Sequence, residues 1–468
     1  MSEQLCEMNL ADVAALIRSR QVSPVEVTER TLERIERLNP RRNAFWTVTA
    51  ELAREQARAA ETQIVKGEYR GPLHGVPVGL KDLIYTRATR TTAGSKILAD
   101  FVPDFDATVV EKLRLAGAVL VGKTALHEFA YGITNDNPHY GPTRNAWDPE
   151  RTSGGSSGGS GVAVATGMCF AALGTDTGGS IRIPASFNGV VGLKPTFGRV
   201  SCHGVFPLSH SLDHVGPMAR SVVDAGIVLQ FIAGFDPNDP ASVNRPLGEI
   251  ALRKSLEGVR IGVPENFFFD AVHPEVERLV RDALRVLEQC GAEVRQVSLR
   301  DMAELTDASR LTLTAEAYVV HQQDLENRPN DLGQDVRALL EKGKDISGAD
   351  YVRAQLARQR VRRELERLFE QVDVIVAPST PLPAFRIGET KVELGGKEVD
   401  ARVASTRLLR GFNASGHPAL SLCCGFTREG LPAGMQIVGR LWNEAAVLQV
   451  GYAYEQATTW HQRKPALS

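Results

Sequence analysis

The segment GTDTGGSIRIPASFNGVVGLKPTFGRVS, residues 174–201, decides how this chain is interpreted. It follows an apolar run at residues 171–174, and its first seven residues end in Ser180, which two glycines precede. Because glycine has no β-carbon, the backbone amides from Thr177 to Ser180 can turn sharply and converge on one oxygen atom. Such amides stabilise the negative charge of an acyl-transfer intermediate, by about 3 to 4 kcal/mol per donor. The segment indicates either a nucleophilic serine with its oxyanion hole or a plain tight turn.

A second segment, GGSSGGSG at residues 154–161, is too rich in glycine for an ordinary strand or a helix interior. It runs directly into the apolar residues 162–165, so we expect a functional turn rather than a flexible linker. No phosphate-binding GxxxxGK[ST] or GxGxxG pattern occurs here, which argues against nucleotide binding. Ser157 fits G-x-S-x-G, but that match is weak because residues 145–150 before it predict a loop instead of a strand.

A serine nucleophile needs a group that takes its proton. Five histidines are candidates by position, although a structural role is the simpler interpretation for most: His74, His127, His203, His210 and His214. Lysine is the other candidate, and Lys81 stands at the end of the apolar stretch GVPVGLKD, residues 75–82. A buried lysine has a lowered pKa, so its neutral amine can act as a base. The alternative is a surface ion pair between Lys81 and Asp82.

Apolar periodicity predicts the organisation of the chain. Helical spacing between residues 9 and 64 predicts an N-terminal helical layer over residues 1–65. Residues 66–468 read as one intertwined catalytic domain, with a charged, helical variable region at about residues 300–371. Buried strands are expected at residues 76–80, 119–122, 162–165, 171–174, 258–263, 372–377, 418–424 and 435–438.

The composition limits the classes of binding partner and the cellular compartment that we expect. Lys plus Arg is 54 and Asp plus Glu is 56, so no net field favours nucleic acid or an anionic membrane. The six cysteines include no CxxC pair, and the N-terminus lacks a signal pattern. We therefore expect a cytoplasmic enzyme with a small-molecule amide substrate and no cofactor, metal, nucleic-acid or membrane partner. We also allow for a homodimer.

Taken together, these segments resemble the amidase signature family over most of the chain. The motifs that carry the resemblance are GVPVGLKDL (75–83), AGAVLVGKTALHEFAYG (116–132), GGSSGGSG (154–161), residues 174–201, SLDHVGPMARSVVD (211–224), DVIVAPSTPLPA (373–384), FNASGHPALSLCCGF (412–426) and GLPAGMQIVG (430–439). The resemblance implies an α/β fold, in which a large mixed β-sheet core is covered by helices on both faces as an α/β/α sandwich.

The resemblance also implies a Ser, cis-Ser, Lys triad of Ser180, Ser156 and Lys81. Ser180 would attack the amide carbonyl and Ser156 would relay its proton toward neutral Lys81, which gives an acyl-enzyme that water hydrolyses. The family's cis peptide would lie between Gly155 and Ser156. The oxyanion hole is expected at the amides of Thr177, Gly178, Gly179 and Ser180. The supporting residues are expected to be Ser157, Asp176 and Arg182.

Three functions fit this pattern. The leading one is a free-standing amidase, a hydrolase of carbon–nitrogen bonds other than peptide bonds, acting on a small amide, carbamate or ureido compound. The second is the glutaminase subunit of a tRNA-dependent amidotransferase, which we place lower because residues 320–410 lack the glycine-rich and tyrosine-rich blocks of that subunit. A non-catalytic scaffold is disfavoured because the triad is present. The substrate stays open: Arg402, Arg407 and Arg410 could bind a carboxylate or lie in solvent.

Overall fold

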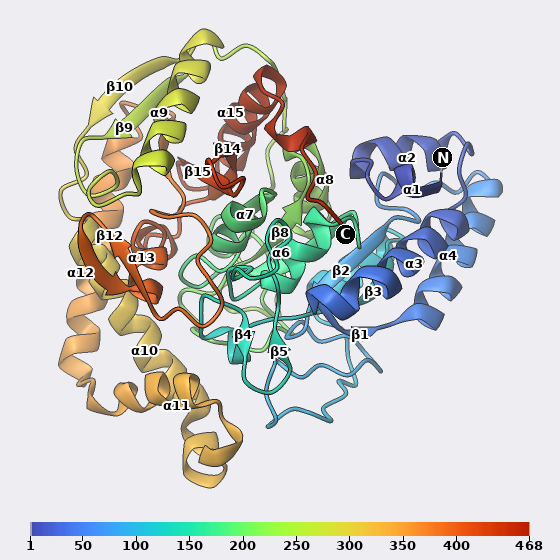
Figure 1. Cartoon of the computed structure of the whole chain (residues 1–468), viewed down its shortest axis with the longest axis horizontal. Coiled ribbons are helices and arrows are strands. Elements are labelled where there is room, and N and C mark those ends of the chain that lie inside the picture. The colour runs from blue at the N-terminus through green and yellow to red at the C-terminus, as the bar shows by residue number, and fades with distance from the viewer. Residues whose placement is uncertain (1, 468) are drawn as a thin grey trace.

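Eleven strands form one mixed sheet through the centre of the molecule, in the order β1-β3-β2-β6-β8-β7-β14-β15-β11-β9-β10 (Figure 1). This computed structural model describes residues 2–467, and all statements below concern those residues. The strands are β1 (Phe45–Val48), β2 (Pro77–Lys81), β3 (Val119–Thr124), β6 (Ala171–Thr175), β7 (Val191–Lys194), β8 (Val215–Ala219), β9 (Arg260–Pro264), β10 (Glu293–Val297), β11 (Val374–Pro378), β14 (Ala419–Phe426) and β15 (Pro432–Gly439). Strands β3, β2 and β6 run parallel to one another, whereas β6 through β11 alternate in direction.

Helices cover both faces of this sheet, as the sequence predicts for an α/β/α sandwich. One face packs against α3 (Pro24–Arg42), α4 (Ala50–Val65), α6 (Gly158–Ala165) and α7 (Arg182–Asn188). The other packs against α2 (Leu10–Arg18), α5 (Thr108–Leu115), α8 (Val222–Ile232), α9 (Pro274–Gln289) and α15 (Glu444–Ala457). The predicted fold class is confirmed.

The remaining elements lie around this sandwich. The region from residue 300 to 371 is helical, as expected, and its helices are α10 (Met302–Asn327), α11 (Gln334–Glu341) and α12 (Gly348–Leu368). The others are α1 (Ser2–Leu5), α13 (Ala401–Arg407), α14 (Arg410–Ala414) and the strand pairs β4 (Asp136–Asn137) with β5 (Gly141–Pro142) and β12 (Lys391–Leu394) with β13 (Lys397–Asp400). Short 3-10 helices occupy Glu128–Ala130, Pro329–Asp331, Lys342–Asp345 and Trp460–Gln462.

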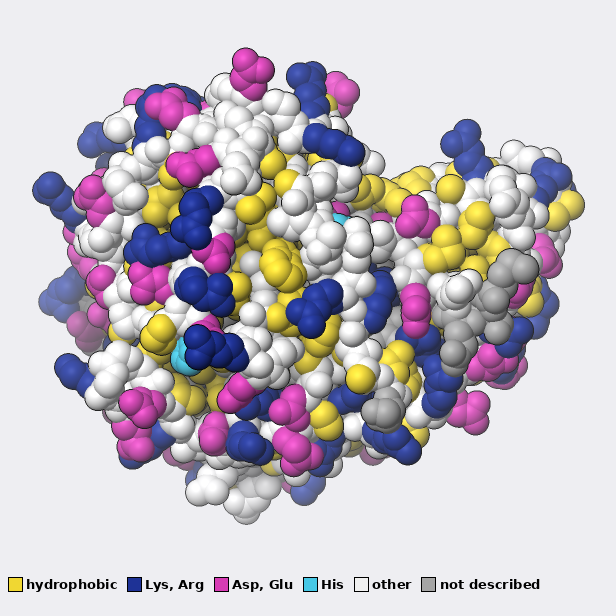
Figure 2. Space-filling view, turned by 45° about the horizontal axis from the view of Figure 1, so that its top comes forward, with side chains coloured by type: hydrophobic (Ala, Val, Ile, Leu, Met, Phe, Trp, Pro, Cys, Tyr) yellow, Lys and Arg dark blue, Asp and Glu magenta, His cyan; other side chains and the backbone are white. Residues whose placement is uncertain are grey.

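The distribution of charge on the surface agrees with the nearly equal numbers of basic and acidic residues. Basic and acidic side chains are interspersed on the face shown in Figure 2, with no large area of one sign. Within residues 2–467, none of the helices has the length and apolar character needed to cross a membrane.

The glycine-rich segment departs from the sequence prediction. The sequence predicts a strand at residues 162–165 and places the glycines before them outside a helix, yet residues 158–165 all belong to α6. The reason is close packing: a β-carbon on Gly159 would stand 2.4 Å from the Ala125 nitrogen and 2.5 Å from the Ala44 oxygen. Tertiary contacts therefore require glycine here and outweigh its low helix propensity.

The N-terminal layer also departs from the prediction, because it is not purely helical. Residues 45–48 form β1, which pairs antiparallel with β3 at the edge of the central sheet. The left-handed conformation of Asn43, with φ of 50°, ends α3 and turns the chain into this strand. Four residues are too short for a period-2 pattern to be distinguished within a helical stretch.

Candidate active site

Lys81 is the last residue of β2, and the parallel neighbour β6 ends at Thr175, so the two residues meet at one edge of the sheet. Lys81 Nζ lies 2.7 Å from both Thr175 Oγ1 and Ser156 Oγ. Lys81 is fully buried, and this burial lowers its pKa to about 7 although the carboxylates of Asp213 and Asp176 oppose the shift. An ammonium with that pKa loses its proton near neutral pH, as a general base requires. The alternative of a surface ion pair with the neighbouring aspartate does not fit this burial.

Ser156 and Ser157 lie in the turn that leads into α6. The peptide bond between Gly155 and Ser156 is cis, as the resemblance implies. The carbonyl oxygen of Ser156 accepts a hydrogen bond of 3.2 Å from the His127 amide, which fixes the turn. Ser157 Oγ is occupied, since it donates to the Thr175 oxygen at 3.1 Å and accepts from the Thr175 nitrogen at 3.2 Å. Ser157 thus fastens the turn to β6, which leaves Ser156 facing Lys81.

Ser180 lies in the tight turn between β6 and α7. Its carbonyl oxygen accepts from the Ser157 amide at 3.2 Å, which joins the two serine turns. The residue is 7% exposed, and its hydroxyl has no hydrogen-bond partner among residues 2–467. This hydroxyl is therefore free to meet a substrate.

The amides around Ser180 differ in whether they already have a hydrogen-bond acceptor. The Gly179 amide is engaged, because it donates to Asp176 Oδ1 at 2.8 Å. In the part of the chain that the structure describes, the amides of Thr177, Gly178 and Ser180 have no acceptor. Three of the four amides expected to form an oxyanion hole thus remain available for a ligand oxygen.

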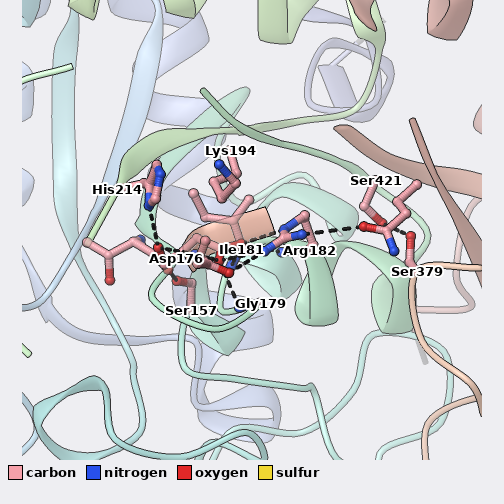
Figure 3. A network of polar contacts seen from close by, with 12 residues as sticks. Ser157, Asp176, Gly179, Ile181, Arg182, Lys194, His214, Ser379 and Ser421 are labelled. Atoms are coloured by element: carbon pink, nitrogen blue, oxygen red, sulfur yellow. Dashed lines mark hydrogen bonds and ion pairs between the residues drawn. The ribbon is translucent and has the colours of Figure 1, made fainter. Parts of the chain in front are cut away.

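Asp176 and Arg182 form a fully buried ion pair that braces the turn carrying Ser180 (Figure 3). Asp176 Oδ2 accepts from Arg182 Nε at 3.0 Å and from the Ile181 amide at 3.2 Å. Burial raises the pKa of Asp176, but the charge and hydrogen bonds of Arg182 outweigh it, so the pKa lies below its usual range. The carboxylate stays ionised and holds the amides on either side of Ser180 in place.

Three polar residues that sequence reasoning did not single out complete the site. Asn413 Nδ2 donates to Asp176 Oδ1 at 2.8 Å. Gln436 Oε1 accepts from Arg182 Nη1 at 3.4 Å, and Asp213 Oδ1 accepts from Thr177 Oγ1 at 2.6 Å. Each lies inside one of the motifs 211–224, 412–426 and 430–439 that carry the family resemblance, and this membership is the signal that could have found it.

The histidines considered as bases do not contact the serine hydroxyls. His214 contacts the turn that carries Ser180, with Nδ1 2.6 Å from the Leu212 oxygen and 3.1 Å from the Asp176 oxygen. His127 Nε2 pairs with Asp335 at 2.8 Å. Of the five candidates, none bonds to Ser156 Oγ or Ser180 Oγ anywhere in residues 2–467. Lys81 is the one candidate base that the fold brings to a serine hydroxyl.

With this geometry in hand, comparison with known proteins places the chain among amide-cleaving enzymes. The sequence profile of the Amidase family matches residues 26–448. One subunit of the glutamyl-tRNA(Gln) amidotransferase of Moorella thermoacetica is 40% identical, over 99% of each chain. The structure of a bacterial aryl acylamidase of the amidase signature family superposes with a TM-score of 0.90 at 32% identity, over 97% of each chain. The amidotransferase subunit of the same name from Thermotoga maritima gives a TM-score of 0.81 at 33% identity, over 97% of this chain and 95% of that one.

These relatives correct the expectation about partners. From the sequence we expect no nucleic-acid partner and allow for a homodimer. That expectation is wrong, because relatives matched end to end are named as one subunit of an enzyme that acts on glutamyl-tRNA(Gln). The near-zero net charge, on which the expectation rested, reports on the whole surface and does not exclude recognition through other subunits or a local patch.

Proposed function

Because this chain belongs to the Amidase family, the amidase signature enzymes that act on carbon–nitrogen bonds, we propose that it cleaves an amide through an acyl-enzyme on Ser180. The observation that carries the proposal is the 2.7 Å contact between the buried Lys81 amine, with a pKa of about 7, and Ser156 Oγ. A neutral amine in that position can accept the Ser156 proton while it donates to Thr175 Oγ1.

In the proposed reaction, Ser180 Oγ attacks the amide carbonyl carbon. Its proton passes to Ser156 Oγ as the Ser156 proton passes to Lys81, and the amides of Thr177, Gly178 and Ser180 stabilise the oxyanion. The carbon–nitrogen bond then breaks, and the proton held by Lys81 returns through Ser156 to the leaving nitrogen. Water attacks the acyl-enzyme by the same relay, which releases the acid and restores Ser180.

Two biological settings share this chemistry, and the relatives favour the first. In that setting the chain is the amide-cleaving, glutaminase subunit of a tRNA-dependent amidotransferase, which the 40% identity over 99% of both chains supports. The second setting is a hydrolase that works without partners. It is favoured by the higher TM-score to the aryl acylamidase, 0.90, than to the Thermotoga protein, 0.81.

Labelling and turnover test the chemistry and separate the settings. A fluorophosphonate probe should label the wild-type chain, and Ser180→Ala should abolish the labelling; equal labelling of the two would contradict the nucleophile. Ammonia release from glutamine and from simple amides is then measured with the purified chain. Efficient turnover of simple amides without any partner supports the stand-alone hydrolase, whereas glutaminase activity that appears only with partner proteins and tRNA supports the amidotransferase.

A further inference from the structure

Arg410 is a buried cation beside the nucleophile turn. It is the first residue of α14 and is 6% exposed. A β-carbon on Gly178 would stand 3.4 Å from Arg410 Cγ and 3.6 Å from its Cζ and Nη1. The neighbouring Leu409 packs on Gly179 in the same way. The guanidinium therefore lies against the turn whose amides are available for the oxyanion, two residues from Ser180.

The guanidinium of Arg410 has no partner in the described chain. Its Nη1 is buried without an acceptor, and no hydrogen bond from the rest of the group reaches any of residues 2–467. Burial, and then the charge of Arg402, lower the pKa of Arg410 to about 9, which leaves it charged at neutral pH. Burial of a cation without hydrogen bonds lowers the stability of a protein, so a buried cation is usually paired with an anion.

The surroundings of Arg410 add positive charge instead of neutralising it. Arg402 lies over the ring of Tyr131, with its Cζ 5.0 Å from the centroid, and also donates no hydrogen bond to a described residue. Arg310, from α10, contributes a further like charge at Arg410, although it is exposed and pairs with Asp307 at 3.2 Å. Of the residues that perturb Arg410, the phenol of Tyr131 is the only one that favours the charged form.

We propose that Arg410 binds an anionic group of the substrate, and that the amide cleaved at Ser180 carries a carboxylate. The planar fork of a guanidinium pairs with both oxygens of a carboxylate, which would supply the acceptors that Arg410 lacks. Arg402, whose charge acts on Arg410, adds to the attraction. This proposal rests on amide cleavage at Ser180, as proposed above, and on neither of its two settings.

Matched substrates test the proposal on the full wild-type chain. Succinamate is compared with butyramide, and glutaramate with valeramide, because each pair has the same carbon chain and differs in the carboxylate. We expect kcat/KM to be about 100-fold higher for the acidic member. Arg410→Met should lower kcat/KM for succinamate about 100-fold and that for butyramide much less, which removes the preference. Arg407→Gln is the control, since Arg407 instead donates to the Asp270 carbonyl, and it should keep the preference.

Two binding measurements keep the proposal testable without turnover. Succinate should raise the melting temperature of wild-type protein and should not raise that of Arg410→Met. Without ligand, Arg410→Met should be no less stable than wild type, because it removes an unpaired buried charge. Equal kcat/KM within each pair would overturn the proposal and leave amide cleavage intact. Absence of turnover and of Ser180 labelling would overturn the proposed function, and absence of the succinate effect would overturn the role of Arg410 separately.

Discussion

Replacement of Lys81 by arginine is the sharpest test of the proton relay. With a pKa of about 7, roughly half of Lys81 is neutral at pH 7 and about 1% at pH 5. Wild-type kcat/KM should therefore rise about tenfold per pH unit from pH 5 to 6.5 and level off above about pH 8. A guanidinium in the same place keeps its proton, because arginine is not deprotonated in proteins, so it cannot accept the proton of Ser156. Lys81→Arg should lose at least about 100-fold of kcat/KM at pH 7 and should not recover between pH 7 and 9.

The assay is release of ammonia or amine, measured from pH 5 to 9 on a neutral amide. Lys123→Gln is the matched control, because Lys123 is another buried lysine, in the neighbouring strand β3, that donates to Ile84 and Thr91 and not to a serine of the site. This control should change stability without moving the midpoint of the pH profile. A flat wild-type profile between pH 5.5 and 8.5, or near-wild-type activity of Lys81→Arg, would refute the relay.

Four further substitutions test the framework of the site and of the fold. Asp176→Asn leaves the Arg182 charge buried without its partner, so a loss of about 3 to 5 kcal/mol in denaturant unfolding is expected, together with loss of labelling. Gly159→Ala, which brings a β-carbon within 2.4 Å of backbone, should destabilise by about 2 kcal/mol or more, whereas Gly226→Ala in helix α8, with 3.7 Å of space, should stabilise by about 0.5 to 1 kcal/mol. Burial raises the pKa of Glu455 to about 8, so its contribution to stability is complete below about pH 4.5 and is lost as the pH rises through 8. Glu455→Gln should raise the melting temperature at pH 9 and much less at pH 5; an equal change at both would contradict this.

The sequence was sufficient for the elements and residues whose signal is local. Helix α9 begins and ends where its apolar periodicity does, at Pro274 and Gln289, and the strands that carry Lys81 and Thr175 follow their apolar runs. Ser180 could be found because the glycines that shape its turn lie next to it. The arrangement of Lys81 and Ser156 follows from the resemblance, since 75 residues separate them and no local pattern joins them.

What the sequence could not provide depends on distant contacts. Helix α6 needs glycine at position 159 because backbone of the residue after β3 and of the residue before β1 approaches it, and these contacts cannot be inferred from the segment itself. Likewise, nothing in the sequence distinguishes Arg410 from arginines that are exposed to solvent. The fold shows that Arg410 is buried against Gly178. The proposed role of Arg410 therefore depends on the fold, whereas Ser180 can be proposed as the nucleophile from the sequence alone.

The bond between Asn413 and the Asp176 carboxylate joins residues that are 237 positions apart. Asp176 in turn orients the amides on both sides of Ser180, and its partner Arg182 also contacts Gln436 from β15, the last strand in the chain. During synthesis, the N-terminal part emerges first and can begin to fold before these partners exist. The serine turn would then stay unbraced until nearly the whole chain has left the ribosome, so nascent or C-terminally truncated chains should be inert. Hydrolytic activity should therefore appear only after synthesis of the chain is nearly complete.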